Sequence, residues 1–291
     1  MKLLIILTTC LNILHADIKL NIKSDNQLET KNNNKLKILS WNIKMLPNPY
    51  GYILKSKERT KLIISKLKSE KKYDLILFQE AFTSDSREQI YKELNSIYPY
   101  QIIPKNNDYF SNNSGLWVIS AVPLELVNEI FFQESAGWDR FANKGAKLYQ
   151  INKNNQDFYI INTHMQANEK NDYSYIRTSQ INQINELIVG PYSKNLIPIF
   201  LIGDLNVSKS SNLIKYLNIL NMKNGELNGD LNFSCYNNNT KSKELLDYIL
   251  FKSNSFNYST FSRKILKFSD LLNENQTHMS DHYPIEGIIE W

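Results

Sequence analysis

The feature that most constrains the fold of this 291-residue chain is a set of short apolar runs, each with a ligand-type polar residue at one end. Four runs end in such a residue, in the order Asn42, Glu80, His164 and Asp204. Two others begin with one, Asp247 and His282. If all six side chains meet at one edge, the last two strands run opposite to the first four. This arrangement requires mixed or antiparallel sheets and excludes an all-parallel doubly wound sheet.

The apolar runs predict seven strands, interspersed with three stretches of helical periodicity. The predicted strands cover residues 36–41, 74–78, 116–120, 158–162, 196–202, 245–251 and 283–289. The predicted helices cover residues 57–70, 85–97 and 173–189. In the third helix, Ile181, Ile184 and Ile188 recur on one face. Helices with one apolar face cover the outer sides of such sheets, so we expect an α/β (α+β) fold.

The first 16 residues are typical of a secretory signal. Lys2 precedes an apolar stretch over residues 3–14, and Ala16 suits the position before a cleavage site. We therefore expect a secreted or periplasmic protein. Residues 17–35 are predicted to form a polar leader segment, and residues 36–291 a single domain. Cleavage after residue 16 would leave Cys235 as the single cysteine, which predicts no internal disulfide.

The polar residues at the strand ends are carboxylates, carboxamides and two imidazoles, which together suit hydrolysis of a phosphate ester. Zinc favours clusters of His and Cys, and this set contains no Cys, so zinc is a poor fit. Glu80 and Asn42 offer the hard oxygen ligands that suit Mg²⁺ with retained waters. One imidazole would activate water while another group assists the leaving oxygen. The sequence has no G-x-S-x-G and no G-x-x-x-x-G-K-[ST] motif, which argues against a serine hydrolase or a P-loop NTPase.

Each of these residues, taken singly, also has a structural explanation. Glu80 suits a solvated strand end, Asn42 a turn, and Asp204 the cap of a following helix. Single histidines are ordinary on a surface or in a core. Only the joint pattern of six strand ends favours one shared site.

Eight motifs occur in the order found in the endonuclease/exonuclease/phosphatase superfamily, and the chain resembles that superfamily from about residue 36 to its C-terminus. The motifs are LSWNIKMLP, LILFQEAF, ANKGAKLY, INTHMQA, IRTSQINQI, IGDLNVSK, LLDYI and SDHYPIE. GDLN and SDH are shared across the superfamily. WNIKMLP, NKG followed by THMQA, and IRTSQ are similar to the branch of secreted bacterial neutral sphingomyelinases.

This resemblance implies a four-layer sandwich, in which two mixed β-sheets pack face to face with helices on both outer sides. It implies one catalytic domain over residues 36–291 that hydrolyses sphingomyelin to ceramide and phosphocholine. The implied cofactor is Mg²⁺, with Mn²⁺ or Co²⁺ as substitutes. The implied partner is membrane sphingomyelin, reached through peripheral membrane contact by a monomer that binds no nucleic acid.

The resemblance also implies roles for residues at the metal and at the attacking water. Glu80 is expected to be the central metal ligand, with Asn42 beside it. His282 is expected to be the general base, oriented by Asp247. Because consecutive residues of an extended chain point to opposite sides, Asp281 is expected to face the metal or fix the turn, and not to hold His282.

A second group is implied at the phosphate and the leaving group. His164, Asp204 and Asn206 are expected to line the phosphate, with His164 assisting departure of the leaving oxygen. Asp139 and Lys144 match a pair near the catalytic centre in this branch and are expected, with Asn206, to bind substrate.

The chain departs from the branch at two places. Some bacterial sphingomyelinases bind a second metal at the domain edge, where this chain has Ser84, Asn113 and Ser114, which are poor replacements. We therefore expect no edge metal.

Those enzymes also enter membranes through a hairpin with exposed aromatic residues. This chain has Leu271 and Leu272 there, without a Trp or Phe. We expect weaker docking at this segment, or docking through residues 131–138 together with the net charge of +5.

Two alternative functions remain open on the sequence. A secreted nuclease of the same superfamily, like a deoxyribonuclease toxin subunit, is expected to have a larger basic surface. A net charge of +5 does not require such a surface. A non-catalytic binding module on this fold would be expected to lack an imidazole or the metal carboxylate, and none is missing.

Overall fold

The computed structural model of the chain describes residues 34–70, 72–105, 113–168, 171–237, 240–273 and 275–291. The predicted signal sequence over residues 1–16 and the leader up to residue 33 lie outside these ranges. Residues Lys35–Trp291 form one compact unit. Among the described residues, no helix is both long enough and apolar enough to cross a membrane.

The first sheet of the described chain has seven strands in the spatial order β10-β14-β15-β1-β2-β4-β3. They are β1 (Lys35–Met45), β2 (Leu75–Ala81), β3 (Tyr100–Ile102), β4 (Trp117–Ser120), β10 (Glu226–Asn228), β14 (Thr260–Ile265) and β15 (Ile285–Glu290). Strand β1 is parallel to β2 and antiparallel to β15, so this sheet is mixed.

The second sheet has six strands within the described ranges, in the order β5-β6-β7-β8-β13-β9. They are β5 (Leu124–Phe131), β6 (Gly145–Lys153), β7 (Gln156–His164), β8 (Ile199–Asp204), β9 (Lys223–Asn224) and β13 (Asp247–Lys252). Strand β8 is parallel to β7 and antiparallel to β13, so this sheet is mixed as well. A separate ribbon pairs β11 (Cys235–Asn237) with β12 (Ser242–Glu244).

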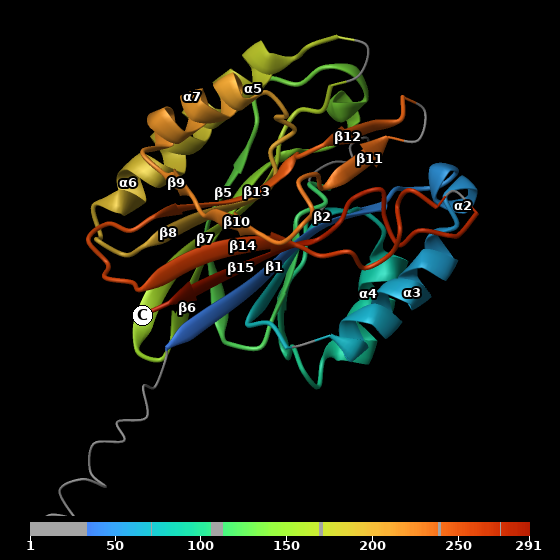
Figure 1. Cartoon of the computed structure of the whole chain (residues 1–291), viewed down its shortest axis with the longest axis horizontal. Coiled ribbons are helices and arrows are strands. Elements are labelled where there is room, and N and C mark those ends of the chain that lie inside the picture. Colours follow the sequence, from blue (N-terminus) through green and yellow to red (C-terminus); the bar gives the residue numbers. More distant parts are fainter. Residues whose placement is uncertain (1–33, 71, 106–112, 169–170, 238–239, 274) are drawn as a thin grey trace, which may run out of the picture. The chain divides into compact units, whose positions relative to one another are not determined.

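Helices cover the outer side of each sheet, and Figure 1 shows the resulting four layers. Beside the first sheet lie α2 (Tyr50–Ile53), α3 (Ser56–Ser69) and α4 (Ser84–Leu94). Over the second sheet lie α5 (Ser174–Ile184), the π-helical turn η2 (Asn185–Val189), α6 (Gly190–Ser193) and α7 (Ser210–Leu220). A 3₁₀ turn, η1 (Gly137–Phe141), precedes β6. The predicted four-layer sandwich of two mixed sheets is confirmed.

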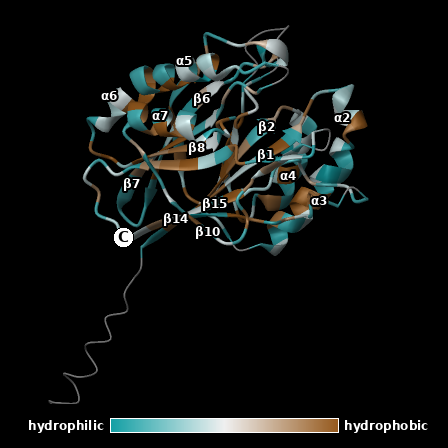
Figure 2. Cartoon of the chain, turned by 45° about the horizontal axis from the view of Figure 1, so that its top comes forward, coloured by the Kyte–Doolittle hydropathy of each residue, from teal (hydrophilic) through white to brown (hydrophobic). Residues whose placement is uncertain are grey.

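The central strands are apolar on both faces because both faces are buried. In β8, Phe200 and Ile202 pack between the two sheets, while Ile199 and Leu201 pack against the helices outside the second sheet. Side chains alternate across a strand, so a strand covered on both sides reads as a continuous apolar run. Figure 2 shows this as hydrophobic strands inside and hydrophilic residues on the outer helices.

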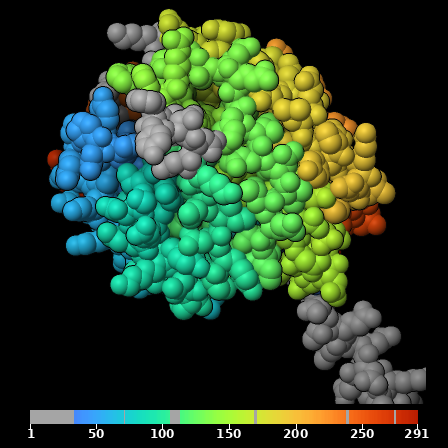
Figure 3. Space-filling view, turned by 180° about the vertical axis from the view of Figure 1, so that it is seen from behind, coloured from blue at the N-terminus to red at the C-terminus, as the bar shows by residue number. Residues whose placement is uncertain are grey.

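All seven predicted strands and all three predicted helices are present, with boundaries shifted by a few residues. The sequence reasoning missed α7 and several strands, among them β5, β6 and β14. The missed β5 and β14 have polar, partly exposed residues between their apolar ones. Figure 3 shows the reverse face, where segments near residues 50 (blue), 90 (teal) and 140 (green) share one surface although they are far apart in sequence.

Candidate active site

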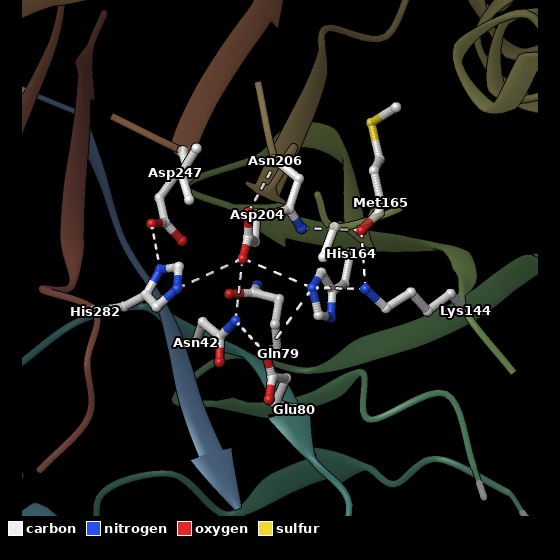
Figure 4. A network of polar contacts seen from close by, with 12 residues as sticks. Asn42, Gln79, Glu80, Lys144, His164, Met165, Asp204, Asn206, Asp247 and His282 are labelled. Carbon is white, nitrogen blue, oxygen red and sulfur yellow. Dashed lines mark hydrogen bonds and ion pairs between the residues drawn. The ribbon is translucent and has the colours of Figure 1, made fainter. Parts of the chain in front are cut away.

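The strand register brings residues from three neighbouring strands of the second sheet side by side. His164 ends β7 opposite Asp204 at the end of β8, and Asp204 lies opposite Asp247 at the start of β13. Asn42 and Glu80 come from β1 and β2 of the first sheet. The six strand-end residues therefore meet where the two sheets adjoin, as Figure 4 shows for their side chains.

A pocket of about 830 Å³ opens at this junction. Eight of the ten residues predicted for the site line it: Glu80, Asp139, Lys144, His164, Asp204, Asn206, Asp281 and His282. The other two, Asn42 and Asp247, are fully buried and contact pocket residues from behind.

The imidazole of His282 is held by Asp247 and not by its sequence neighbour. Asp247 Oδ2 lies 2.8 Å from His282 Nδ1. With the proton on Nδ1, this contact fixes the tautomer that leaves the Nε2 lone pair free. Burial lowers the pKa of His282, but the Asp247 carboxylate and Cys235 raise it, and the net pKa stands well above the ordinary value.

Asp247 is itself fixed by a residue that the sequence reasoning missed. The hydroxyl of Ser234 donates to Asp247 Oδ2 at 2.6 Å and accepts the backbone N–H groups of Leu246 and Asp247. Ser234 is fully buried. It belongs to no motif or periodic run, so nothing in the sequence pattern marks it.

The carboxylate of Asp204 lies between the two imidazoles. Its Oδ2 is 3.6 Å from His164 Nε2 and 3.8 Å from His282 Nε2, and it accepts a hydrogen bond from Asn42 Nδ2 at 3.0 Å. Its Oδ1 accepts the backbone N–H of Asn206 at 2.9 Å. Burial, together with the nearby Asp247 carboxylate, raises the pKa of Asp204 to about 7.

His164 is paired with a buried lysine. Lys144 Nζ lies 3.0 Å from His164 Nε2, 2.8 Å from Asp139 Oδ2 and 2.9 Å from the Met165 carbonyl oxygen. Burial lowers the pKa of His164 well below its ordinary value, and the Lys144 charge lowers it further. The lowered pKa favours the neutral imidazole, and its Nε2 accepts a hydrogen bond from the Lys144 ammonium. His164 thus lies in the pocket beside Lys144, where it is expected to line the phosphate and assist the leaving oxygen.

Glu80 and Asn42, the pair expected to hold the metal, lie side by side at the pocket. Asn42 Nδ2 donates to Glu80 Oε1 at 2.8 Å, and the Glu80 side chain is partly open to the pocket. As placed, the amide NH₂ of Asn42 faces both carboxylates, and its oxygen accepts the backbone N–H of Lys44 at 3.1 Å. A half-turn that presents the oxygen to an ion would break this last contact. Carboxylate and carboxamide oxygens are the ligands that Mg²⁺ prefers, so the chemistry of these two side chains fits a hard cation.

Three pocket residues adopt left-handed backbone conformations that no sequence pattern predicts. Glu80 has φ 52°, Asn206 has φ 51° and Lys44 has φ 49°. Positive φ is uncommon for residues other than glycine and concentrates at functional sites.

Asp281, expected at the metal, forms an ion pair with Lys44 in the structure. Lys44 Nζ lies 2.5 Å from Asp281 Oδ2. Burial raises the pKa of Asp281, but the Lys44 ammonium outweighs it and brings the pKa to about 2. The partner of Asp281 in the structure is thus Lys44, a residue that the sequence analysis did not consider.

Aromatic side chains form a rim at the pocket mouth. Tyr50, Trp138 and Phe141 line the pocket and are 50%, 69% and 57% exposed. The Trp138 ring centroid lies 6.5 Å from that of Tyr50 and 5.9 Å from that of Phe141. Tyr52 and Ile53 continue the exposed apolar surface on α2. We call these five residues the aromatic rim.

One of the two leucines in the segment where weaker docking is expected is buried. Leu271 is 2% exposed and belongs to the core between the sheets, and its backbone N–H donates to the Tyr283 hydroxyl. Only Leu272 of this pair is exposed.

At the position where some relatives bind an edge metal, the side-chain amide of Asn113 donates to the Phe82 carbonyl oxygen and accepts the backbone N–H of Gly115.

The fold and the pocket together define a four-layer α/β sandwich whose polar site lies at the junction of two mixed sheets. The chain belongs to the endonuclease/exonuclease/phosphatase family, whose family model matches residues 39–282.

Among known proteins, the chain is similar to sphingomyelinase C 2 of Leptospira interrogans, at 30% identity over 91% of this chain and 48% of that protein. It is similar to sphingomyelinase C of Listeria ivanovii at 27% identity, over 76% of each chain. The chain spans about half the length of the first two curated relatives that it matches, both from Leptospira.

Two solved structures share the fold. SmcL matches with a TM-score of 0.73 and 23% identity, over 88% of this chain and 99% of that chain. A beta toxin variant from Staphylococcus aureus with bound magnesium ions matches with a TM-score of 0.73 and 21% identity, over 87% of this chain and 99% of that chain.

Proposed function

We propose that this chain is a secreted, Mg²⁺-dependent phosphodiesterase that hydrolyses sphingomyelin to ceramide and phosphocholine. The observation that carries the proposal is the aromatic rim directly above a pocket that holds a carboxylate-oriented imidazole. The curated relatives named sphingomyelinase C support the choice of substrate. Export is inferred from the signal-like residues 1–16.

The proposed attack on phosphorus begins at His282. Its Nε2 takes a proton from a water molecule, while Asp247 keeps the other ring nitrogen protonated and stabilises the imidazolium that forms. Asp204 lies 3.8 Å from the same Nε2 and accepts a hydrogen bond from Asn42, so its carboxylate helps to order the water.

The proposed binding of the phosphate and the leaving oxygen lies on the opposite side of the pocket. The Asn206 amide and the Lys144 ammonium present N–H donors there, His164 lines the same side, and Asp139 holds Lys144 in place at 2.8 Å. We infer that Lys144 stabilises charge developing on the leaving oxygen, with its position set by Asp139, His164 and Met165.

Mg²⁺ would be held by Glu80 and Asn42 together with water, and Mn²⁺ or Co²⁺ would substitute. When bound, the ion would neutralise charge on the phosphoryl oxygens. An additional positive charge in the pocket would also lower the pKa values of Asp204 and His282, which leaves His282 neutral over more of the physiological range.

The aromatic rim supports a choline lipid over a nucleic acid. Tryptophan and tyrosine favour the interface between water and lipid, and aromatic faces attract quaternary ammonium groups. A nuclease would need basic side chains along the approach to the pocket, where this chain presents Tyr50, Trp138 and Phe141. We therefore propose peripheral membrane contact by a monomer and no nucleic acid partner.

The test is phosphocholine release from sphingomyelin vesicles, measured beside nicking of supercoiled plasmid DNA, each with Mg²⁺ and with a chelator. The proposal predicts Mg²⁺-dependent phosphocholine release and no nicking. Nicking without phosphocholine release would overturn it in favour of the nuclease.

A further inference from the structure

Cys235 lies beside the proposed base although nothing in the sequence pattern links the two. The donor atoms of Cys235, Asp281 and His282 all lie within 4.8 Å of one another. Cys235 is free, partly exposed and lines the pocket. The set of strand-end residues contains no cysteine, but the fold adds one to it.

The backbone fixes this arrangement. Cys235 and His282 form an isolated antiparallel β-bridge. The N–H of Tyr236 donates to the Asp281 carbonyl at 3.1 Å, and the N–H of Tyr283 donates to the Ser234 carbonyl at 2.7 Å. The thiol and the imidazole are therefore held opposite each other before any ligand arrives.

The chemistry of the three donors is that of a zinc ligand set. Zinc is bound by Cys sulfur, His nitrogen and Asp oxygen, and a site with three protein ligands keeps one position open. A ligating histidine commonly gives its other N–H to a carboxylate, which orients the ring. His282 has this second partner in Asp247 at 2.8 Å, and Asp247 is fixed in turn by Ser234.

We propose that Cys235, Asp281 and His282 form an inhibitory site for a thiophilic divalent cation such as Zn²⁺, separate from the Glu80–Asn42 site. On binding, the thiol proton leaves to solvent and the sulfur and His282 Nε2 coordinate the ion. The lone pair that would accept a proton from water is then occupied. Mg²⁺ prefers hard oxygen ligands and would not compete for the thiolate.

The Lys44 ammonium would compete with a cation for Asp281 at this site. Its ammonium lies 2.5 Å from Asp281 Oδ2, and its side chain is one-third exposed, so it can leave toward solvent. A zinc ion must displace this ammonium from Asp281. Removal of the Lys44 charge should therefore strengthen zinc binding.

The inhibition part of this inference rests on the proposed function, whereas the binding part does not. The first arm measures phosphocholine release at saturating Mg²⁺ as Zn²⁺ is added. Cys235→Ser should retain the activity seen without zinc and should raise the half-inhibiting Zn²⁺ concentration by at least about tenfold, because even an outer partner of a metal ligand is worth that much in affinity. Lys44→Gln should lower that concentration. Equal zinc sensitivity of Cys235→Ser and the unaltered chain would overturn the proposal, as would a rise for Lys44→Gln.

The second arm needs no enzymatic activity. In a Cys10→Ser chain, whose single thiol is Cys235, Zn²⁺ should slow alkylation by iodoacetamide, and a chelator should restore the rate. Mg²⁺ should give no protection, and Asp281→Asn should weaken the protection by Zn²⁺. Alkylation at an unchanged rate in the presence of Zn²⁺ would overturn the site even if the chain proves to have no phosphodiesterase activity.

Discussion

Asp247 and His282, 35 positions apart in sequence, share a contact of 2.8 Å between Oδ2 and Nδ1, while Asp281, the residue next to His282, binds Lys44 instead. Asp247 begins the strand that pairs with β8, so its carboxylate enters from the second sheet. His282 precedes β15 of the first sheet. The contact therefore joins the two halves of the sandwich at the site.

Loss of the Glu80 carboxylate should remove Mg²⁺-dependent activity. Glu80 is partly exposed at a strand end and contributes little to the core. Glu80→Gln should therefore leave the thermal unfolding midpoint close to that of the unaltered chain while phosphocholine release is lost. Glu88→Gln, on the exposed face of α4, is the matched control and should keep full activity. Mg²⁺-dependent turnover that survives in Glu80→Gln would remove Glu80 from the metal site.

Loss of the aromatic rim should weaken membrane contact more than catalysis. A double substitution, Trp138→Ser with Phe141→Ser, removes two side chains that are more than half exposed. We expect weaker cosedimentation with sphingomyelin vesicles and a larger loss of activity on vesicles than on a soluble choline phosphodiester.

The control for this pair is Leu187→Ser, an exposed apolar residue in η2 that does not line the pocket. It should bind vesicles normally. Equal losses on the vesicle and soluble substrates for the rim variant would mean that the rim serves the pocket chemistry and not docking.

Removal of the Ser234 hydroxyl should destabilise the fold and impair the proposed general base, His282. Ser234→Ala leaves two buried N–H groups and a carboxylate oxygen without their shared partner. We expect a loss of about 1–3 kcal/mol in the free energy of unfolding, measured in urea, together with reduced kcat. Ser211→Ala, on the exposed first turn of α7, should change neither quantity. Unaltered stability and kcat in Ser234→Ala would show that the hydroxyl does not position Asp247.

The core strands could be predicted because a strand that is buried on both faces has apolar residues at consecutive positions. Strands β2, β7 and β8 are of this kind; β7 and β8 end in His164 and Asp204, and Glu80 is the last residue but one of β2. Strands β5 and β14 carry partly exposed residues, so their runs are interrupted and were missed. The sequence also did not indicate which residue of an apolar pair is buried. Leu271 faces the core, whereas Leu272 faces solvent.

The partners of the site residues could be predicted only in part. Alternation along an extended chain already separated Asp281 from His282, because consecutive side chains point to opposite sides. Ser234, Lys44 and Cys235 reach the site through irregular backbone or long-range pairing, as in the bridge between Cys235 and His282. Such contacts depend on the tertiary fold and produce no periodic pattern in the sequence.

The most direct test of the account is the pH dependence of kcat/KM in the unaltered chain, Asp247→Asn and Asp281→Asn. Activity should fall on the acid side as His282 gains a proton, and His282→Ala should cost about 10²–10⁴ in rate. The Asp247 carboxylate raises the pKa of His282, so Asp247→Asn should move the acid limb to lower pH. Asp281→Asn should leave the limb nearly in place, because the Asp281 charge is paired with Lys44. A limb that moves in Asp281→Asn and stays fixed in Asp247→Asn would contradict the assignment of Asp247 as the partner of the base.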